Sequence, residues 1–129
     1  MLIQVPVSWG ELVDKITILQ IKSERITDKA KLANIHKELE ELTRTAEQAV
    51  TFTPEIRALQ QQLKDVNEKL WVIEDDIRDC ERSKDFGAKF IELARAVYFT
   101  NDERFRVKRE INDALGSALS EEKSYAAYA

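Results

Sequence analysis

Apolar residues recur along most of the chain in steps of three and four, the spacing that places them on one face of an α-helix. The clearest run follows Thr53 and Pro54, which suit an N-cap and a first helical position, because proline lacks the N–H that would stay unpaired there. The pattern predicts a helix over residues 54–84, about 45 Å long at roughly 1.5 Å per residue. Its apolar positions follow a coiled-coil spacing: Ile56, Leu59, Leu63, Val66, Leu70, Ile73, Ile77 and Cys80.

A second helix is predicted over residues 9–48. Ser8 and Glu11 match a capping box, in which hydroxyl and carboxylate each satisfy an otherwise unpaired backbone N–H. The apolar repeat of the first half is out of phase with that of the second half, and the change falls at Thr27 and Asp28, which are good N-cap residues. We therefore expect a kink or a break near 27–28. Residues 1–7 read as an extended arm or a short edge strand that needs a partner.

A third helix is predicted over residues 87–119, after a turn at residues 85–87. Thr100 and Glu103 form a second capping-box pattern, which allows a joint near residue 100. The remaining tail, residues 120–129, is short and polar at first and then rich in Tyr and Ala. It either folds back on the helices or frays.

Short connections between long helices predict antiparallel neighbours. The expected fold is therefore all-α, one domain over residues 1–129, built as a long antiparallel three-helix bundle with coiled-coil character. Trp71 lies outside the seam of its helix, so it should pack against a third helix or a partner subunit. Such a thin rod is expected to self-associate, with a dimer favoured, and a charge at Leu63 or Leu70 should abolish the association. Its surface also suits a protein partner.

Composition agrees with this picture. The chain is 43% apolar and 34% charged, with three Gly and two Pro, as long helices are and sheet-rich folds are not. A net charge of −4 without a basic stripe argues against nucleic-acid binding. No apolar run approaches the ~20 residues that span a bilayer, and no signal peptide is visible, so we expect no membrane association and a cytoplasmic location. Cys80 and His36 stand alone, and we predict no cofactor and no metal site.

Three polar features interrupt the apolar pattern. The first is Asp14 with Lys15, inside the segment 12–21, whose apolar residues cover most of the helix circumference. Buried charges are costly unless they are paired. The pair is either an ordinary ion pair at the start of a helix or part of a wet cavity.

The second feature follows Trp71. Glu74 and Arg78 share a helical stripe with this tryptophan, and Asp75 lies beside them. Glu74 and Asp75 are the candidate catalytic acid and base, and the same acids would also suit a divalent cation. The alternative interpretation is the solvated flank of a coiled coil.

The third feature is a gap in the last apolar repeat, where Asn101, Arg104 and Lys108 take core positions. Antiparallel pairing of the second and third predicted helices would bring all three features to one half of the bundle. A polar site between helices is one outcome, since arginine presents a fork matched to phosphate and carboxylate. The candidate ligand-binding residues are Asp14, Lys15, Trp71, Arg78, Arg95, Tyr98, Asn101, Arg104 and Lys108.

Several segments resemble a family of small bacterial proteins known only as a domain of unknown function. They are SWGELVDKITIL at 8–19, LWVIEDDIR at 70–78, LAR at 93–95, Tyr98, NDER at 101–104 and EEKSY at 121–125. The resemblance spans nearly the whole chain and implies a bacterial source but no activity. Two hypotheses remain from the sequence: a self-associating interaction module, and a small anion- or metal-binding helical enzyme.

Overall fold

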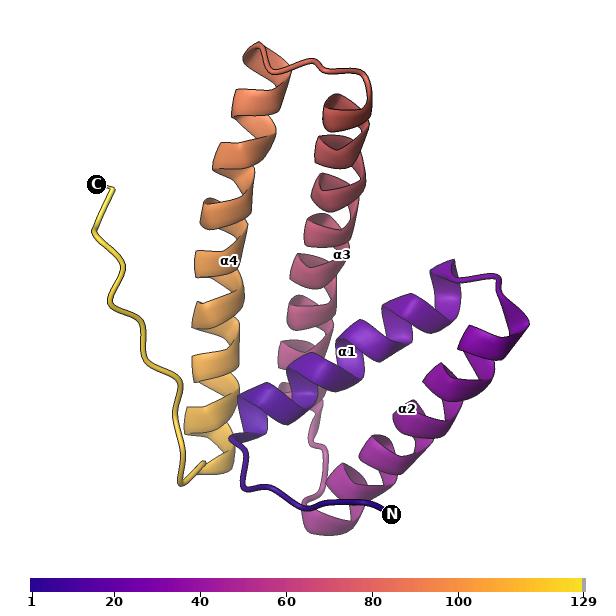
Figure 1. Cartoon of the computed structure of the whole chain (residues 1–129). Helices are drawn as coiled ribbons and strands as arrows, with labels where there is room; N and C mark the ends of the chain where they lie inside the picture. Colours follow the sequence, from indigo (N-terminus) through magenta and orange to yellow (C-terminus); the bar gives the residue numbers. More distant parts are fainter. Residues whose placement is uncertain (129) are drawn as a thin grey trace.

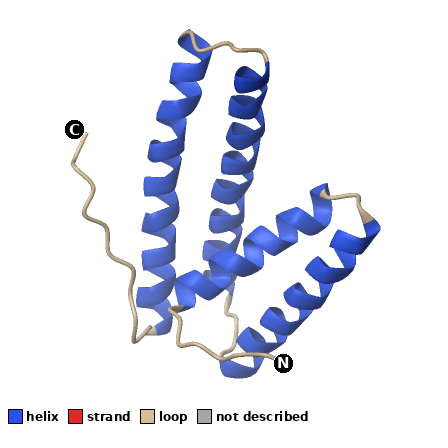
Figure 2. Cartoon of the chain, viewed as in Figure 1, coloured by secondary structure: helices blue, strands red, loops and turns tan. Residues whose placement is uncertain are grey.

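The computed structural model describes residues 1–128, and this part of the chain contains four α-helices and no strand (Figure 2). The helices are α1 (Trp9–Arg25), α2 (Lys29–Ala49), α3 (Pro54–Arg82) and α4 (Ala88–Leu115). The all-α prediction is confirmed, but the three-helix bundle is not, because residues 9–48 form two helices. Among the described helices, none combines the length and the apolar character needed to cross a bilayer.

The break between α1 and α2 lies where the change of phase predicted a kink or a break. Ile26 leaves the helix with an extended backbone, and the Asp28 carboxylate caps the next helix by accepting the Lys31 backbone N–H at 2.9 Å. The chain reverses there, so that α2 lies against α1 (Figure 1). The two out-of-phase repeats therefore belong to two helices rather than to one bent rod.

The other helix ends follow local side-chain chemistry. The hydroxyls of Ser8 and Thr53 accept backbone N–H groups at the starts of α1 and α3, at 3.2 and 3.3 Å. The joint allowed near residue 100 does not form, because Thr100 is buried inside the continuous helix α4. This helix ends at Leu115, before the predicted residue 119, because Gly116 takes a left-handed φ of 62° that closes the helix.

The four helices do not lie side by side as a simple bundle. Helices α3 and α4 form a long antiparallel hairpin, and α1 crosses its lower half with α2 on its outer side (Figure 1). Helix α1 lies against all three other helices, whereas α2, within the described chain, lies against α1 alone. The upper half of the α3–α4 hairpin therefore extends beyond α1.

The core sits where α1 crosses the hairpin. Gly10 permits the close approach of α1 to α4, because a Cβ at this position would lie 2.5 Å from the Lys108 carbonyl oxygen. Leu63 is fully buried within its own chain, so a charge there would test folding rather than self-association. The buried cluster consists of Val13, Leu59, Leu63, Val107 and Ile111, with Trp9 and Leu115 packed against it.

Two extended segments flank the helices. Residues 1–7 form no strand and leave the side chains of Leu2, Ile3, Val5 and Val7 exposed. After Gly116 the chain turns back and runs along α4, so the tail folds back rather than frays (Figure 1). The last residue of the predicted tail 120–129, residue 129, lies outside the described residues.

Candidate functional site

Asp14 is the centre of a buried polar network where α1, α3 and α4 meet. Its side chain is 3% exposed, and its two oxygens accept hydrogen bonds from Arg104 Nε at 2.9 Å and Arg104 Nη2 at 2.5 Å. Asn67 Nδ2 donates to Asp14 Oδ1 and to Thr17 Oγ1, both at 3.0 Å. We call these four residues the buried network. These hydrogen bonds to a carboxylate are of the strong, charge-assisted kind, and they join α1 to both α3 and α4.

The same pairing fixes the charge of Arg104. Its hydrogen bonds with Asp14 raise the pKa of the guanidinium above its ordinary value despite partial burial. A third guanidinium nitrogen lies 3.5 Å from Asn101 Oδ1. The arginine is thus used within the chain to join α1 to α4, and its fork is not free for an oxyanion.

Lys108 forms a second polar centre one turn further along α4. The residue is 5% exposed, and its Nζ lies 2.9 Å from Glu11 Oε2 and 2.8 Å from Glu121 Oε1. Burial alone would lower the pKa of Lys108, but hydrogen bonds to Glu121 and Glu11 outweigh it and raise the pKa. The lysine therefore stays charged and links α4 both to the start of α1 and to the tail.

The tail makes a third set of contacts along α4. Lys123 Nζ lies 2.7 Å from Asp102 Oδ1 and 5.1 Å from the ring centroid of Phe105. Asp102 also accepts the Tyr128 hydroxyl, and the hydrogen bonds from Lys123 and Tyr128 hold the pKa of Asp102 below its usual range. The same bond raises the pKa of Tyr128. A pocket of about 450 Å³ remains between helix and tail, lined by Tyr98, Asn101, Arg104 and Lys108 among others.

The charges of this region favour no anion. The carboxylates are Glu11, Asp14, Asp102 and Glu121, and the cations are Arg104, Lys108 and Lys123. Each cation already contacts a carboxylate, and the acids outnumber the bases. Within residues 1–128, no three His, Cys, Asp or Glu side chains are grouped so as to hold a metal ion.

The other sequence candidates lie outside this region. Lys15 is exposed and pairs with Glu38 of α2 at 2.9 Å. Glu74 and Arg78 pair with each other on the exposed surface of α3, next to the exposed Asp75. These acids occupy the solvated flank that was one of the two interpretations of their spacing.

Trp71 and Arg95 also lie apart from the buried network. The guanidinium of Arg25 in α1 stands 6.0 Å from the centroid of the Trp71 ring, so a third helix does reach this tryptophan. Arg95 is exposed and lies near the hydroxyl of Tyr98 and over the ring of Phe99. Of the nine candidates, the structure brings together Asp14, Arg104, Lys108, Asn101 and Tyr98.

Sequence reasoning missed Thr17, Asn67, Glu11 and Glu121. Asn67 precedes Trp71 by four residues, so extending the stripe of Trp71 and Glu74 back by one turn finds it. Glu121 lies in the tail, where no helical period places a residue. Its position follows from the fold alone.

A groove between α3 and α4 forms a second candidate surface, and Arg25 of α1 lines one end of it. It consists of two neighbouring hollows of about 620 and 590 Å³, both lined by Lys69 and Ile73. Its apolar rim is open to solvent: Val72 is 45%, Ile91 56% and Phe99 44% exposed. We call this surface the hairpin groove.

Comparison with known proteins yields a family but no activity. No curated protein and no solved structure shows a significant match to this chain. The model of the family of unknown function DUF6165 matches residues 3–128, a span that includes the buried network, the hairpin groove and the tail. This agrees with the resemblance to an uncharacterised domain. The chain belongs to the DUF6165 family of unknown function.

Proposed function

We propose that the protein is a self-associating helical interaction module that dimerises through the hairpin groove. The observation that carries the proposal is the exposed apolar rim formed by Val72, Ile91 and Phe99. Each side chain leaves roughly half of its surface in water, and full burial of one such side chain stabilises by about 1.5–3 kcal/mol. Three of them along one groove supply a substantial driving force for association.

The architecture above α1 supports the same conclusion. A hairpin of two helices has only one helix–helix seam in which to bury apolar residues, whereas a four-helix bundle closes a complete core. Val72 and Ile73 are adjacent on α3, yet Ile73 is buried and Val72 is open. The hairpin of a second copy, placed across the groove, would cover the open side and complete such a bundle.

The charges around the groove suit a second copy of this chain. Its lining includes Lys69 and Arg95 as well as Glu92 and Glu103, and Lys69 lies 3.9 Å from Glu103 across the two helices. Lys69 of α3 and Arg95 of α4 are the cations of this lining. In a two-fold dimer the same surface patch of each copy faces that of the other. A patch that carries both positive and negative charges can therefore pair its cations with the acids of the second copy.

A matched pair of variants tests the proposal. Ile91→Glu places two carboxylates, one from each copy, in the proposed interface, and we expect the dimer dissociation constant to rise by about tenfold or more. The control is Ile3→Glu, the same substitution at another exposed isoleucine, in the N-terminal arm, which should leave association unchanged. Light scattering coupled to size exclusion measures both, and circular dichroism checks the fold.

The reverse pattern would refute the groove as the interface. If Ile91→Glu associates as the native chain does, or if only Ile3→Glu dissociates, another surface carries the contact. Val72→Glu gives an independent repeat from α3. Leu63 and Leu70, chosen from the sequence, are poorer test sites because one is fully buried and the other is half-buried in the chain.

A further inference from the structure

The tail is held to α4 by side chains alone. After Ser117, whose N–H bonds to the Asn112 carbonyl at 2.8 Å, no backbone hydrogen bond joins residues 118–128 to the rest of the described chain. Tyr125 is 85% exposed, and the tail contributes no apolar residue to the buried core. Segments fixed by few contacts open at low free-energy cost. The tail can therefore detach from α4 without unfolding the helices.

The face of α4 beneath the tail contacts tail side chains at three positions, two of them charged and one aromatic. Lys108 receives the carboxylate of Glu121, and Asp102 receives the ammonium of Lys123. That ammonium also lies over the rings of Phe105 and Tyr125, at 5.1 and 5.6 Å, as cations do in aromatic sites.

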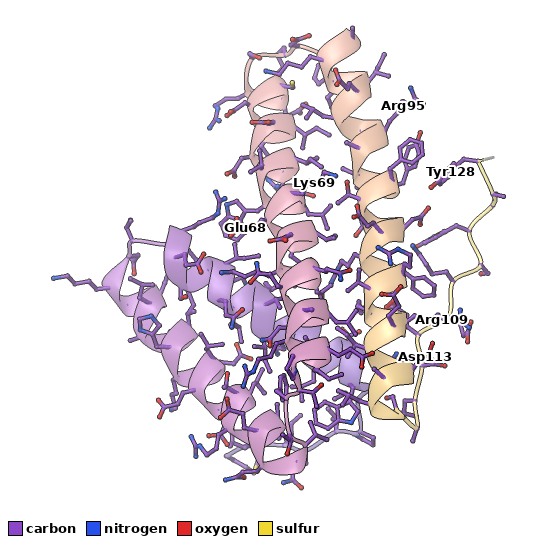
Figure 3. All side chains as sticks on the ribbon, turned by 180° about the vertical axis from the view of Figure 1, so that it is seen from behind. Glu68, Lys69, Arg95, Arg109, Asp113 and Tyr128 are labelled. Carbon is purple, nitrogen blue, oxygen red and sulfur yellow. The ribbon has the colours of Figure 1, made fainter. Side chains whose placement is uncertain are left out.

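The third contact between the tail and α4 is made by aromatic rings. The ring of Tyr128 lies 5.3 Å from that of Tyr98 and 4.7 Å from that of Phe99, between centroids. Tyr128 is thereby brought back beside α4 (Figure 3). Three tail residues, an acid, a lysine and a tyrosine, therefore contact successive positions along α4. An extended peptide contacts a docking surface in the same way.

We propose that this face of α4 is a peptide-docking site and that its external ligand is an extended segment of another protein with the chemistry of the tail. That segment carries an acid, a lysine two residues later and an aromatic residue beyond. Charge complementarity argues for this occupant, since Lys108 selects the acid and Asp102 selects the lysine. The tail then acts as an internal competitor that covers the site until the segment displaces it.

This site shares Phe99 with the hairpin groove, since Phe99 lines one of its hollows and also packs against Tyr128. The tail lies on the side of α4 away from α3 (Figure 1). Among the docking residues, Asp102, Phe105 and Lys108 line none of the hollows between α3 and α4. The two charged contacts of the tail involve no groove residue, so failure of dimerisation would leave the docking proposal standing, and the reverse is also true.

The test uses the full chain with its own tail released. The variant Glu121→Lys with Lys123→Glu reverses both tail charges against Lys108 and Asp102, so its tail should leave the helix. A fluorescent peptide with the native sequence of residues 118–128 is then titrated against native and variant chains and followed by anisotropy. If the native tail covers the site about nine-tenths of the time, release should raise the peptide's affinity about tenfold.

Two controls sharpen the result. Glu122→Lys changes the exposed neighbour of Glu121, so its tail stays docked and its affinity for the peptide should equal that of the native chain. A peptide carrying the reversed charges should not bind the released variant. Equal binding of native and reversed peptides, or no binding to the released variant, would overturn the proposal.

A third outcome concerns the tail of a second copy. In a mixture of two isotope-labelled forms of the native chain, nuclear Overhauser effects between the Tyr128 and Tyr98 rings should arise within one molecule only. Effects between molecules would show that the tail is exchanged between copies, which would overturn the assignment of the site to a different protein.

Discussion

Gly10→Ala should destabilise the protein, although glycine to alanine within a helix ordinarily stabilises by about 0.5–1 kcal/mol. The new Cβ would lie 2.5 Å from the Lys108 carbonyl oxygen and 3.0 Å from Asn112 Oδ1. Backbone cannot yield as a flexible side chain does, so α1 must move away from α4 by a sizeable fraction of an ångström. That movement also weakens the buried hydrogen bond from the Gly10 N–H to Asn112, now 2.6 Å long.

The size of the effect follows from these contacts. Overpacking typically costs about 1–3 kcal/mol, and a hydrogen bond contributes about 1 kcal/mol, against the small gain in helix propensity. We expect a net loss of about 2 kcal/mol. For a chain of 129 residues this lowers the melting temperature by roughly 8 °C, measurable by circular dichroism.

A second background separates the two contacts. In Asn112→Ala the side-chain contact is gone but the Lys108 carbonyl remains, so Gly10→Ala should still destabilise. If Gly10→Ala raises the melting temperature in both backgrounds, α1 does not approach α4 as the structure describes. The buried network, which depends on this approach, would then be in error too.

Three further predictions concern the network, a turn and the tail. Asp14→Ala should lower the free energy of unfolding by about 3–5 kcal/mol, because it leaves the Arg104 guanidinium without its carboxylate; urea denaturation of a double-mutant cycle should show coupling, and additive effects would contradict the pairing. Lys84→Gly should stabilise by about 1 kcal/mol, since Lys84 has a φ of 56° that glycine adopts without strain; a lower melting temperature would refute this. The lowered pKa of Asp102 means that its bond to the tail is fully present above its ordinary pKa and is lost as the pH falls through the depressed value. The raised pKa of Tyr128 means that its hydrogen bond to Asp102 is present below the ordinary pKa of Tyr128 and is lost as the pH rises through the raised value. The ring chemical shifts of Tyr128 report both the acid and the alkaline loss of this bond. Chemical shifts that stay unchanged below the pKa of Asp102 and above that of Tyr128 would contradict the prediction.

Local chemistry explains why much of the fold was predictable. The N-caps Ser8 and Thr53, the proline at residue 54 and the change of repeat near Asp28 each act within a few residues, so sequence reading located all of these helix starts. The same reasoning allowed a joint at Thr100, where packing prevailed and the helix runs on. Cap residues permit a helix to start, but burial decides whether it does.

The arrangement of the helices was less predictable. An apolar repeat states which face of a helix is buried but not at what angle a neighbour crosses it, and α1 crosses the hairpin instead of lying along it. The dense apolar surface of residues 12–21 did indicate burial on several sides, which agrees with three neighbouring helices. Gly10 sets the closest approach and carries no periodic signal.

The candidate site was half predictable for a related reason. Asp14, Arg104 and Lys108 stood out because charged residues occupied apolar positions of a helical pattern. Their partners Asn67 and Glu121 did not stand out, since pairing across 53 and 13 residues depends on the fold. Sequence pattern thus finds the buried charges, and only the structure shows that they are already neutralised within the chain.

The proposed dimer joins two copies of this chain through the hairpin groove. Sedimentation equilibrium of the native chain at increasing concentration shows whether this dimer forms. We expect a mass that rises towards twice the 14.9 kDa of one chain and then stays constant. A mass of one chain at every concentration would contradict it, and a mass that keeps rising would contradict the closed two-fold dimer.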